Sequence, residues 1–356
     1  FTNRMIRNLL VPVVLEQILN SIMGTADTMM VSNVGSAALS AVSLVDSINV
    51  LLIQAFSALA AGGAIVCAQY IGQRNYEKAN MSARQVLFII TAISVVVSAV
   101  CLIFQKPLLR LIFGAVDADV MRASETYFFF TALSFPFIAA YDSAASIFRA
   151  QENTKGPMTI SMISNIMNIG GNAVLIWVFH LGVAGAAIST LVSRIFCAVV
   201  VLWQLRKDRQ PVVVRDYLKI RPDWSMIGRI LGLGIPSGIE NSMFQLGKLA
   251  IQSTVSTLGT AAIAAQAMTN ILENLNGIAA IGVGVGLMTI VGQCLGAGRK
   301  DEAVYYIKKL CVIAEVVIIV SCLIVYVLVR PVTILGGMES TSAEMCIHMI
   351  TRSEER

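Results

Sequence analysis

The chain has 356 residues, of which 56% are hydrophobic and 13% are charged, and its net charge is +5. Soluble domains usually contain about 25% charged residues, so this composition excludes an ordinary soluble fold. Several continuous apolar stretches exceed the roughly 20 residues that a helix needs to cross a bilayer. They do not alternate apolar and polar residues as barrel strands do, so the sequence predicts an all-α integral membrane protein.

Membrane spans are predicted, in chain order, at about 8–31, 38–68, 86–105, 124–148, 158–180, 183–205, 228–254, 261–292 and 306–329. With the N-terminus in the cytoplasm, the connections on the inside hold 18 Lys and Arg residues and those on the outside hold 4. Because cytoplasmic connections carry the excess of basic residues, we expect this orientation in a multi-pass cell-membrane protein, specifically a bacterial inner membrane. Basic residues placed beside spans also argue against a nucleic-acid partner.

An internal repeat organises the chain. VSNVGSAALSA at 31–41 matches VSTLGTAAIAA at 255–265, and the same constant shift along the chain places Pro12 on Pro236. The shift covers six spans, an even number, so both copies should have the same orientation and be related by a pseudo-twofold axis along the membrane normal.

The repeat predicts three segments. They are an N-terminal lobe of six helices at 1–205, a cytoplasmic linker at 206–225 and a C-terminal lobe at 226–356. About nine spans are present, so we expect the second six-helix bundle to be incomplete, with the chain stopping before its helix 10.

Asp27, an acidic residue inside the first span, is the leading candidate for ion coupling. An ionisable side chain at mid-membrane costs about 2.5–3.5 kcal/mol on the insertion scale, so its presence indicates a function. Polar residues at helical spacing on spans 5 and 6 accompany it: Ser161, Asn165, Asn168, Asn172 and Thr190. A carboxylate among amide and hydroxyl oxygens can hold a proton or a hard cation such as Na⁺. The alternative is that Asp27 only bonds across helices.

Further polar residues are predicted to line a substrate cavity: Gln17, Asn20, Asn165, Asn241, Gln245, Lys248 and Glu273. Lys248 and Glu273 either pair with each other across spans 7 and 8 or contact substrate. Glu16 follows Pro12 near the cytoplasmic end of span 1, where an acidic residue favours a helix start. Arg194 in span 6 either reaches toward the cytoplasm or pairs with an acid, and we assign it no function.

Enzyme signatures are absent from the sequence. It contains no HExxH, GxSxG or P-loop pattern, so we expect no catalytic activity and no cofactor. Active transport by this chain would therefore draw on an ion gradient.

Four segments resemble the multidrug and toxic compound extrusion (MATE) family: GTADTMMVSNVGSAALSAV in spans 1 and 2, AQYIGQRNYEKA at the exit of span 2, NIMNIGGNAVLIWVFHLGVAGAAIST in spans 5 and 6, and GQCLGAGRKDEA at the exit of span 8. The resemblance extends to about residue 335. It implies twelve helices in two six-helix lobes and the export of cationic, amphipathic compounds in exchange for H⁺ or Na⁺.

The resemblance also implies a coupling site made by Asp27, Asn168, Asn172 and Thr190. Asn172 departs from the pattern, because related members carry a second carboxylate there; a site with one charge fewer should hold Na⁺ more weakly. Another branch places an essential glutamate on helix 7, where this chain has Phe244. We therefore expect coupling in the first lobe of a monomer surrounded by lipid. A lipid-linked oligosaccharide flippase of similar fold is the alternative, and it would need several basic residues in the cavity.

Overall fold

The computed structural model describes residues 1–113, 116–207, 209–256, 258, 260–335 and 340–354. Regular secondary structure within these ranges is helical. The first half of the chain contains α1 (Asn3–Ser32), α2 (Ser36–Gly72), α3 (Tyr76–Ile103), α4 (Gln105–Phe113), α5 (Ala118–Leu133), α6 (Phe135–Ala150), α7 (Lys155–Asn172), the π-helix η1 (Ala173–Val178) and α8 (Val183–Leu205). After the short η2 (Tyr217–Lys219) come α9 (Trp224–Ser256), α10 (Thr260–Gly296), α11 (Lys300–Leu335) and α12 (Ser340–Glu354).

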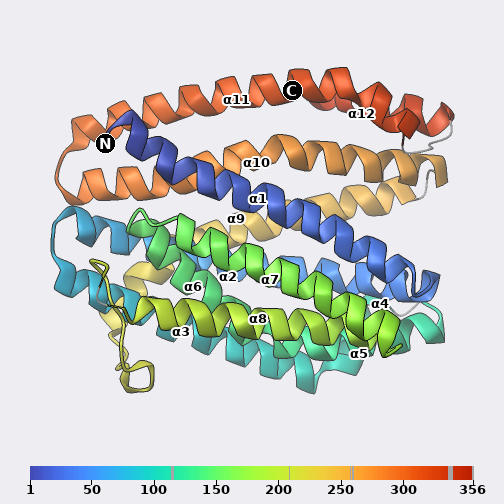
Figure 1. Ribbon diagram of the computed structural model, residues 1–356, viewed down its shortest axis with the longest axis horizontal. Coiled ribbons are helices and arrows are strands. Elements are labelled where there is room, and N and C mark those ends of the chain that lie inside the picture. Colours follow the sequence, from blue (N-terminus) through green and yellow to red (C-terminus); the bar gives the residue numbers. More distant parts are fainter. Residues whose placement is uncertain (114–115, 208, 257, 259, 336–339, 355–356) are drawn as a thin grey trace.

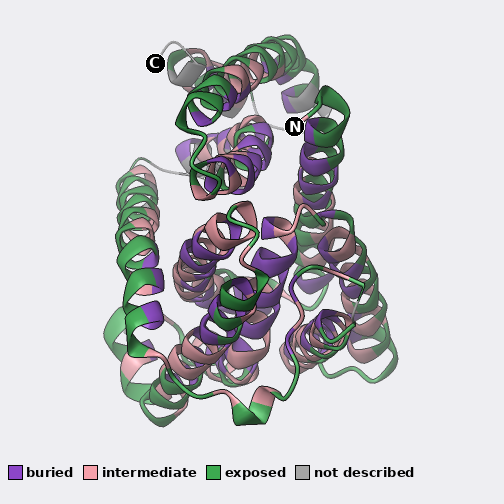
Figure 2. Cartoon of the chain, turned by 90° about the vertical axis from the view of Figure 1, so that its left-hand side faces the viewer, coloured by how far each residue is buried: buried purple, intermediate pink, exposed green. Residues whose placement is uncertain are grey.

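The long helices lie side by side in an elongated bundle, and α1 crosses between α7 and α10, both of which it contacts (Figure 1). Buried residues gather on the faces that helices turn toward each other, while the outer faces are exposed (Figure 2). Many exposed residues are large and apolar, among them Leu111 at 84% and Val327 at 70%. An apolar exterior of this extent suits contact with lipid.

Most of the predicted spans are found among the described helices. Seven helices in the described part of the chain are long and apolar enough to cross a membrane, or eight if the bent pair α5 and α6 forms one span. The predicted span at 228–254 folds as the 33-residue helix α9, which is not among them. The polar side chains along α9 reduce its hydropathy: Glu240, Asn241, Gln245 and Lys248. Within the described residues, length and hydropathy therefore account for seven or eight of the nine predicted spans, and the span at 228–254 stays a prediction.

A bend divides the predicted span at 124–148. Helices α5 and α6 meet at Ser134 at an angle of 43°. Pro136 stands in the first turn of α6, and its ring cannot donate the amide hydrogen that a continuous helix would need. Ser134 itself is fully buried, and its hydroxyl accepts a hydrogen bond from the Arg194 guanidinium at 2.6 Å.

The repeat predicted from sequence is visible in the helix bounds. The shift that places Pro12 on Pro236 also carries both ends of α2 onto the ends of α10, and the start of α3 onto the start of α11. The chain also leaves α2 and α10 in the same way. Arg74 and Gly298 occupy matching positions with φ of 56° and 75°, and their amides bond Ile71 and Leu295 respectively.

Reciprocal contacts between the repeats show that the two copies have the same orientation. Gly72 at the end of α2 lies so close to Gln293 that a Cβ atom would overlap the Gln293 carbonyl oxygen. The matching Gly296 at the end of α10 approaches Gln69 in the same way. Two further contacts obey the same relation: Gly62 with Gly234, and Gly286 with Leu10. A pseudo-twofold axis therefore passes between α2 and α10, as expected for parallel repeats. The lobe boundaries at 205 and 226 stay predictions.

Candidate transport site

A central cavity of about 760 Å³ lies between the helices of the two repeats. Its walls come from α1, α2 and α6 on one side and from α9 and α10 on the other. Five of the seven residues predicted to line a cavity are on these walls: Gln17, Asn241, Gln245, Lys248 and Glu273. Gln17 and Asn241 hold matching positions in the repeat, so the pseudo-twofold relation brings both amides to one space. A volume of this size is typical of a small-molecule site.

The cavity combines polar and apolar surface. Phe244, Ile281 and Met288 contribute apolar side chains beside the amides. The ammonium of Lys248 lies 4.9 Å from the centre of the Phe244 ring, a cation–π arrangement. Lys248 and Glu273 both line the cavity, and within the described part of the chain they form no ion pair with each other.

Asn20 and Asn165, the other two residues predicted for the cavity, lie outside it. The Asn20 side-chain oxygen accepts hydrogen bonds from the Ser161 hydroxyl at 3.1 Å and from the Asn165 amide at 2.6 Å. These bonds join α1 to α7. The polar stripe on α7 thus contributes to helix packing at this level, because amide and hydroxyl groups in lipid are satisfied by neighbouring helices.

Asp27 lies about ten residues farther along α1 than Gln17, which is about 15 Å along the helix axis. It is half-buried, and its carboxylate accepts a hydrogen bond from the side-chain amide of Asn172. Asn172 is fully buried at the last turn of α7, where the π-helix η1 begins. Such π-helical turns are frequent at functional sites. The Asn172 side-chain oxygen has no hydrogen-bond partner among the described residues.

The other two residues of the expected coupling site have different partners. The side-chain oxygen of Asn168 accepts a hydrogen bond from the Ser189 hydroxyl of α8 at 3.0 Å. The Thr190 hydroxyl donates to the Ala186 carbonyl oxygen of its own helix at 3.0 Å. The structure therefore brings Asn172 to Asp27, while Asn168 bonds the neighbouring helix α8 and Thr190 bonds within α8. No cluster of three or more His, Cys, Asp or Glu suited to a metal ion occurs in the described ranges.

A second acidic residue faces the same part of the bundle. Asp46 of α2 accepts a hydrogen bond from the Tyr127 hydroxyl of α5 at 3.0 Å. The guanidinium of Arg194, which is buried and bonded to Ser134, lies within electrostatic range of both Asp46 and Asp27. The sequence places Arg194 in a span but does not bring it together with Asp46, because α2 and α8 lie far apart in the chain.

Glu16 and Arg149 form a buried ion pair that the sequence did not predict. Glu16 is 4% exposed, and its carboxylate accepts a hydrogen bond from the Arg149 guanidinium at 3.0 Å. The Tyr141 hydroxyl donates to the same carboxylate at 3.3 Å. Glu16 therefore lies in the middle of a 30-residue helix and not at a helix start as expected. Arg149 also lines the central cavity, where its charge is offset by Glu16.

Hydrogen bonds between the two repeats gather at the end of the bundle where α1 begins. The Gln293 amide of α10 donates to the Ala150 carbonyl oxygen at 2.9 Å, and the Thr289 hydroxyl donates to that of Arg149 at 3.0 Å. These side chains satisfy carbonyl groups at the C-terminal end of α6, which have no partner inside the helix. The same end holds Arg229 of α9 against Tyr70 of α2, at 2.8 Å. The repeats are thus joined by polar contacts on one side of the cavity.

A family model described as MatE matches residues 12–174 and 236–351, which is most of the chain. The chain belongs to the MATE family. MATE proteins are transporters and not enzymes, in agreement with the sequence-based prediction. The membership and the apolar helices establish a multi-pass membrane protein of a family associated with multidrug efflux.

Curated relatives cover much of this MATE chain. It is 28% identical over 302 residues to the probable multidrug resistance protein YoeA of Bacillus subtilis (strain 168), covering 82% of the chain and 64% of that protein. It is 25% identical over 308 residues to the probable multidrug resistance protein NorM of Thermotoga maritima, covering 85% of the chain and 65% of that protein. The chain thus spans slightly less than two thirds of the length of both relatives.

Solved structures show the same fold. A MOP superfamily transporter from Pyrococcus furiosus superposes with a TM-score of 0.90 over 97% of this chain and 77% of that protein, at 19% sequence identity. A MATE transporter solved in an outward-facing conformation gives the same TM-score and coverage. At this identity the likeness concerns the fold, so substrate and ion are argued from the residues of this chain.

Proposed function

We propose that the chain is a secondary transporter that exports amphipathic organic cations through the central cavity in exchange for H⁺ or Na⁺. Membership of the MATE family and the wall of mixed amide, acidic and apolar side chains support this proposal. Glu273 is the acidic side chain on the cavity wall, and Phe244, Ile281 and Met288 supply apolar surface for the body of such a substrate.

The observation that carries the coupling proposal is the pair Asp27 and Asn172. A carboxylate that accepts one amide bond beside a buried oxygen without a partner can take up a cation or a proton. When Asp27 is protonated, its hydroxyl would donate a hydrogen bond to the Asn172 side-chain oxygen after the Asn172 amide group has rotated by half a turn. The pair supplies one negative charge, which suits a proton; Na⁺, held by the same oxygens, is the second candidate.

The polar contacts between the repeats suggest how access to the cavity alternates. The bonds from Gln293 and Thr289 to the end of α6 close the side of the cavity on which α1 begins. Opening that side requires these bonds to break while the two lobes rock about the axis between α2 and α10. We infer that ion binding at Asp27 shifts this equilibrium through α1, which contacts both α7 and α10.

The flippase alternative has less support from the cavity. An anionic lipid-linked cargo would need several basic side chains there; among the described residues those on the wall are Lys248 and Arg149, and Arg149 is paired with Glu16. Arg194, the other basic residue considered, is bonded to Ser134 away from the cavity wall.

We place the chain in a cell membrane, specifically a bacterial inner membrane, with the N-terminus in the cytoplasm as the basic residues predict. The chain would work as a monomer on small-molecule substrates, without a nucleic-acid partner.

Ethidium transport in proteoliposomes tests the proposal. The purified chain is reconstituted, and uptake is measured under an imposed pH gradient and, separately, under an imposed Na⁺ gradient. We expect Asp27→Asn to abolish gradient-driven uptake. Asp119→Asn is the control, because Asp119 is an exposed carboxylate that pairs with Arg122 on the surface. Uptake by Asp27→Asn at the wild-type rate would contradict the coupling role, and the gradient that drives wild-type uptake identifies the ion.

A further inference from the structure

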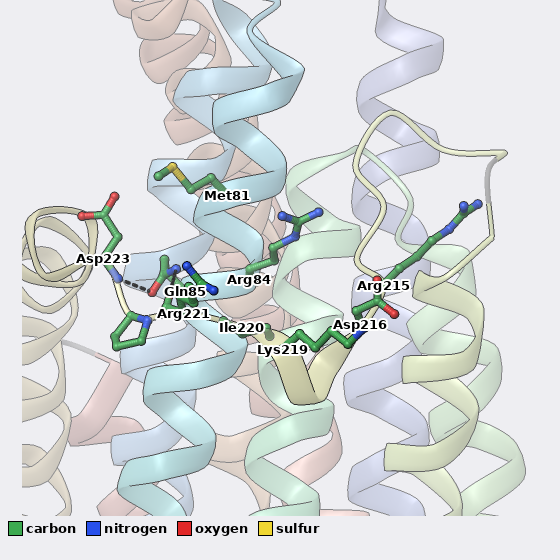
Figure 3. Close-up of a pocket in the computed structure, with 10 residues that line it drawn as sticks. Met81, Arg84, Gln85, Arg215, Asp216, Lys219, Ile220, Arg221 and Asp223 are labelled. Carbon is green, nitrogen blue, oxygen red and sulfur yellow. Dashed lines mark hydrogen bonds between the residues drawn. The ribbon is translucent and has the colours of Figure 1, made fainter.

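A basic pocket of about 440 Å³ lies where the segment between α8 and α9 folds over the beginning of α3 (Figure 3). Four basic side chains line it: Arg84 of α3, and Arg215, Lys219 and Arg221 of the connecting segment. The view shows Gln85 and Arg221 near Asp223 at one end, Arg215 at the other, and Arg84 between them. The central cavity and the coupling residues do not contribute to this pocket.

The pocket is held in shape by polar contacts between the connecting segment and two helices. Gln85 is 3% exposed; its amide donates to the Arg221 carbonyl oxygen at 2.8 Å, and its oxygen accepts from the Asp223 amide at 3.0 Å. The Tyr217 hydroxyl donates to the Leu202 carbonyl oxygen of α8 at 2.5 Å. The backbone that carries the basic side chains is therefore fixed before any ligand binds.

The charges of the pocket are unbalanced. Two acidic residues, Asp216 and Asp223, line the pocket with four basic ones, of which Arg215 also donates to the Arg206 carbonyl oxygen at 3.4 Å. The carboxylate of Asp223 already accepts hydrogen bonds from the backbone amides of Ser225 and Met226, at 3.2 and 3.4 Å, and so caps the start of α9. Within the described part of the chain, the side chains of Arg84, Lys219 and Arg221 make no hydrogen bond or ion pair. Their donors face the pocket and solvent.

Apolar side chains beside the pocket indicate that a membrane surface covers it. Leu218, between two of the lining residues, is 102% exposed, and Trp224 at the start of α9 is 71% exposed. Tryptophan is enriched at the level of lipid headgroups, where its ring contacts the acyl region and its indole N–H stays hydrated. Leu218 lies in the short η2 of the connecting segment and Trp224 is the first residue of α9, so both belong to the region where the boundary between bilayer and water is expected.

We propose that this pocket binds the phosphate-bearing headgroup of an anionic phospholipid in the leaflet on the side where α1 begins. Guanidinium groups match phosphate oxygens with paired hydrogen bonds, and a nearby ammonium adds charge without a fixed direction. Basic clusters next to spans attract anionic lipids in this manner. The exposed Leu218 and Trp224 favour a headgroup that is attached to acyl chains over a soluble phosphate.

Quenching of Trp224 by brominated lipid tests the proposal. The protein carries Trp177→Phe and Trp203→Phe, which leave Trp224 as the single tryptophan, and is reconstituted in phosphatidylcholine vesicles. One set contains phosphatidylglycerol with brominated chains, and a second contains the same fraction of brominated phosphatidylcholine. We expect stronger quenching by the brominated phosphatidylglycerol, and about a tenfold or larger loss of this preference in the triple variant R84Q/K219Q/R221Q.

A matched control removes equal charge from the same end of the bundle. Arg4, Lys300 and Lys308 are exposed and do not line the pocket, so R4Q/K300Q/K308Q should keep the preference. Equal quenching by both lipids in the wild type, or an equal loss in both triple variants, overturns the proposal. Abolition of the preference by inorganic phosphate in the buffer assigns the pocket to soluble phosphate and also overturns it. If the triple variant fails to fold, R221Q alone must weaken the preference for phosphatidylglycerol. An unchanged preference in R221Q overturns the proposal.

Discussion

Arg149 of α6 donates to Glu16 of α1 at 3.0 Å, and this ion pair is buried beside the central cavity. The two residues are 133 positions apart in the chain and belong to different spans. A buried charge that loses its partner is strongly destabilising, because its desolvation is no longer compensated. The pair thus fixes the relative position of two helices that line the transport pathway.

Glu16→Gln is expected to lower the free energy of unfolding by about 3–5 kcal/mol, since the Arg149 charge stays buried without a carboxylate. Thermal unfolding in detergent measures the change. Glu302→Gln is the control: Glu302 forms an exposed ion pair with Arg299, for which the expected loss is below about 1 kcal/mol. Similar melting temperatures for both variants would show that the buried pair does not stabilise the fold.

Gly72→Ala and Gly296→Ala are each expected to destabilise the contact between α2 and α10 by about 1–3 kcal/mol or more. The added methyl group would meet backbone atoms of Gln293 or Gln69, which cannot rotate away. Gly277→Ala on α10 is the control, because a Cβ there has no neighbour within 4 Å and alanine favours helix by up to about 1 kcal/mol. Wild-type melting of both interface variants would argue against close contact at the pseudo-twofold axis.

Charge changes on the cavity wall should act in opposite directions on a cationic substrate. Glu273→Gln removes a charge that attracts the cation and should raise the KM for ethidium roughly fivefold. Lys248→Gln removes a charge that repels the cation and should lower the KM by a similar factor. Both values correspond to about 1 kcal/mol of electrostatic energy in a water-filled cavity. Initial uptake rates in proteoliposomes give both values. The KM of a neutral amphipathic substrate is the control and should change little. A change of the same sign in both variants would indicate that the two residues act through structure.

Comparing Asn165→Ala with Gln17→Ala should distinguish a residue that stabilises helix packing from one that contacts substrate. Asn165 bonds Asn20 between α1 and α7, so its loss should lower stability by about 1 kcal/mol and leave the order of preferred substrates unchanged. Gln17 lines the cavity, so its loss should change that order with a smaller effect on stability. Melting temperature and a panel of dye-uptake rates measure the two effects. The opposite assignment would follow if Asn165→Ala changed the substrate order.

The pH dependence of stability should show the cost of ionising Glu152, which lies in the turn after α6. Burial raises the pKa of its carboxyl group, and a hydrogen bond with Gln293 acts in the opposite direction. Because the folded-state pKa exceeds the ordinary value of 4.5, ionising Glu152 costs stability as the pH rises from that value through the folded pKa. Glu152→Gln should therefore stabilise the protein at neutral pH and have little effect at about pH 4. A melting-temperature difference that does not vary with pH would contradict this cause.

Much of the architecture followed from patterns that are local or periodic in the chain. Apolar runs longer than a bilayer requires predicted the helices, and a constant shift between matching segments predicted a repeat whose second copy, α10, begins and ends where the shift places it. Five of the polar residues that line the cavity were also identifiable, because a polar side chain in an apolar span is costly unless it faces protein or water. The predicted span at 228–254 stands out only because α9 is more polar than its neighbours.

Tertiary structure decided which polar residues meet. Asn20 and Asn241 occur in similar stripes, yet one bonds across α1 and α7 and the other faces the cavity, because the tilt and rotation of each helix are set by packing against its neighbours. Glu16 forms an ion pair with Arg149, and Asp46 accepts a hydrogen bond from Tyr127. In both cases the partners are far apart in the sequence, so no local pattern predicts them. The amino-acid sequence by itself determined that these groups lie inside the membrane and in two related halves. Their partners were determined by the folded bundle, since burial in lipid requires each charge to be satisfied by whichever helix packing brings within reach.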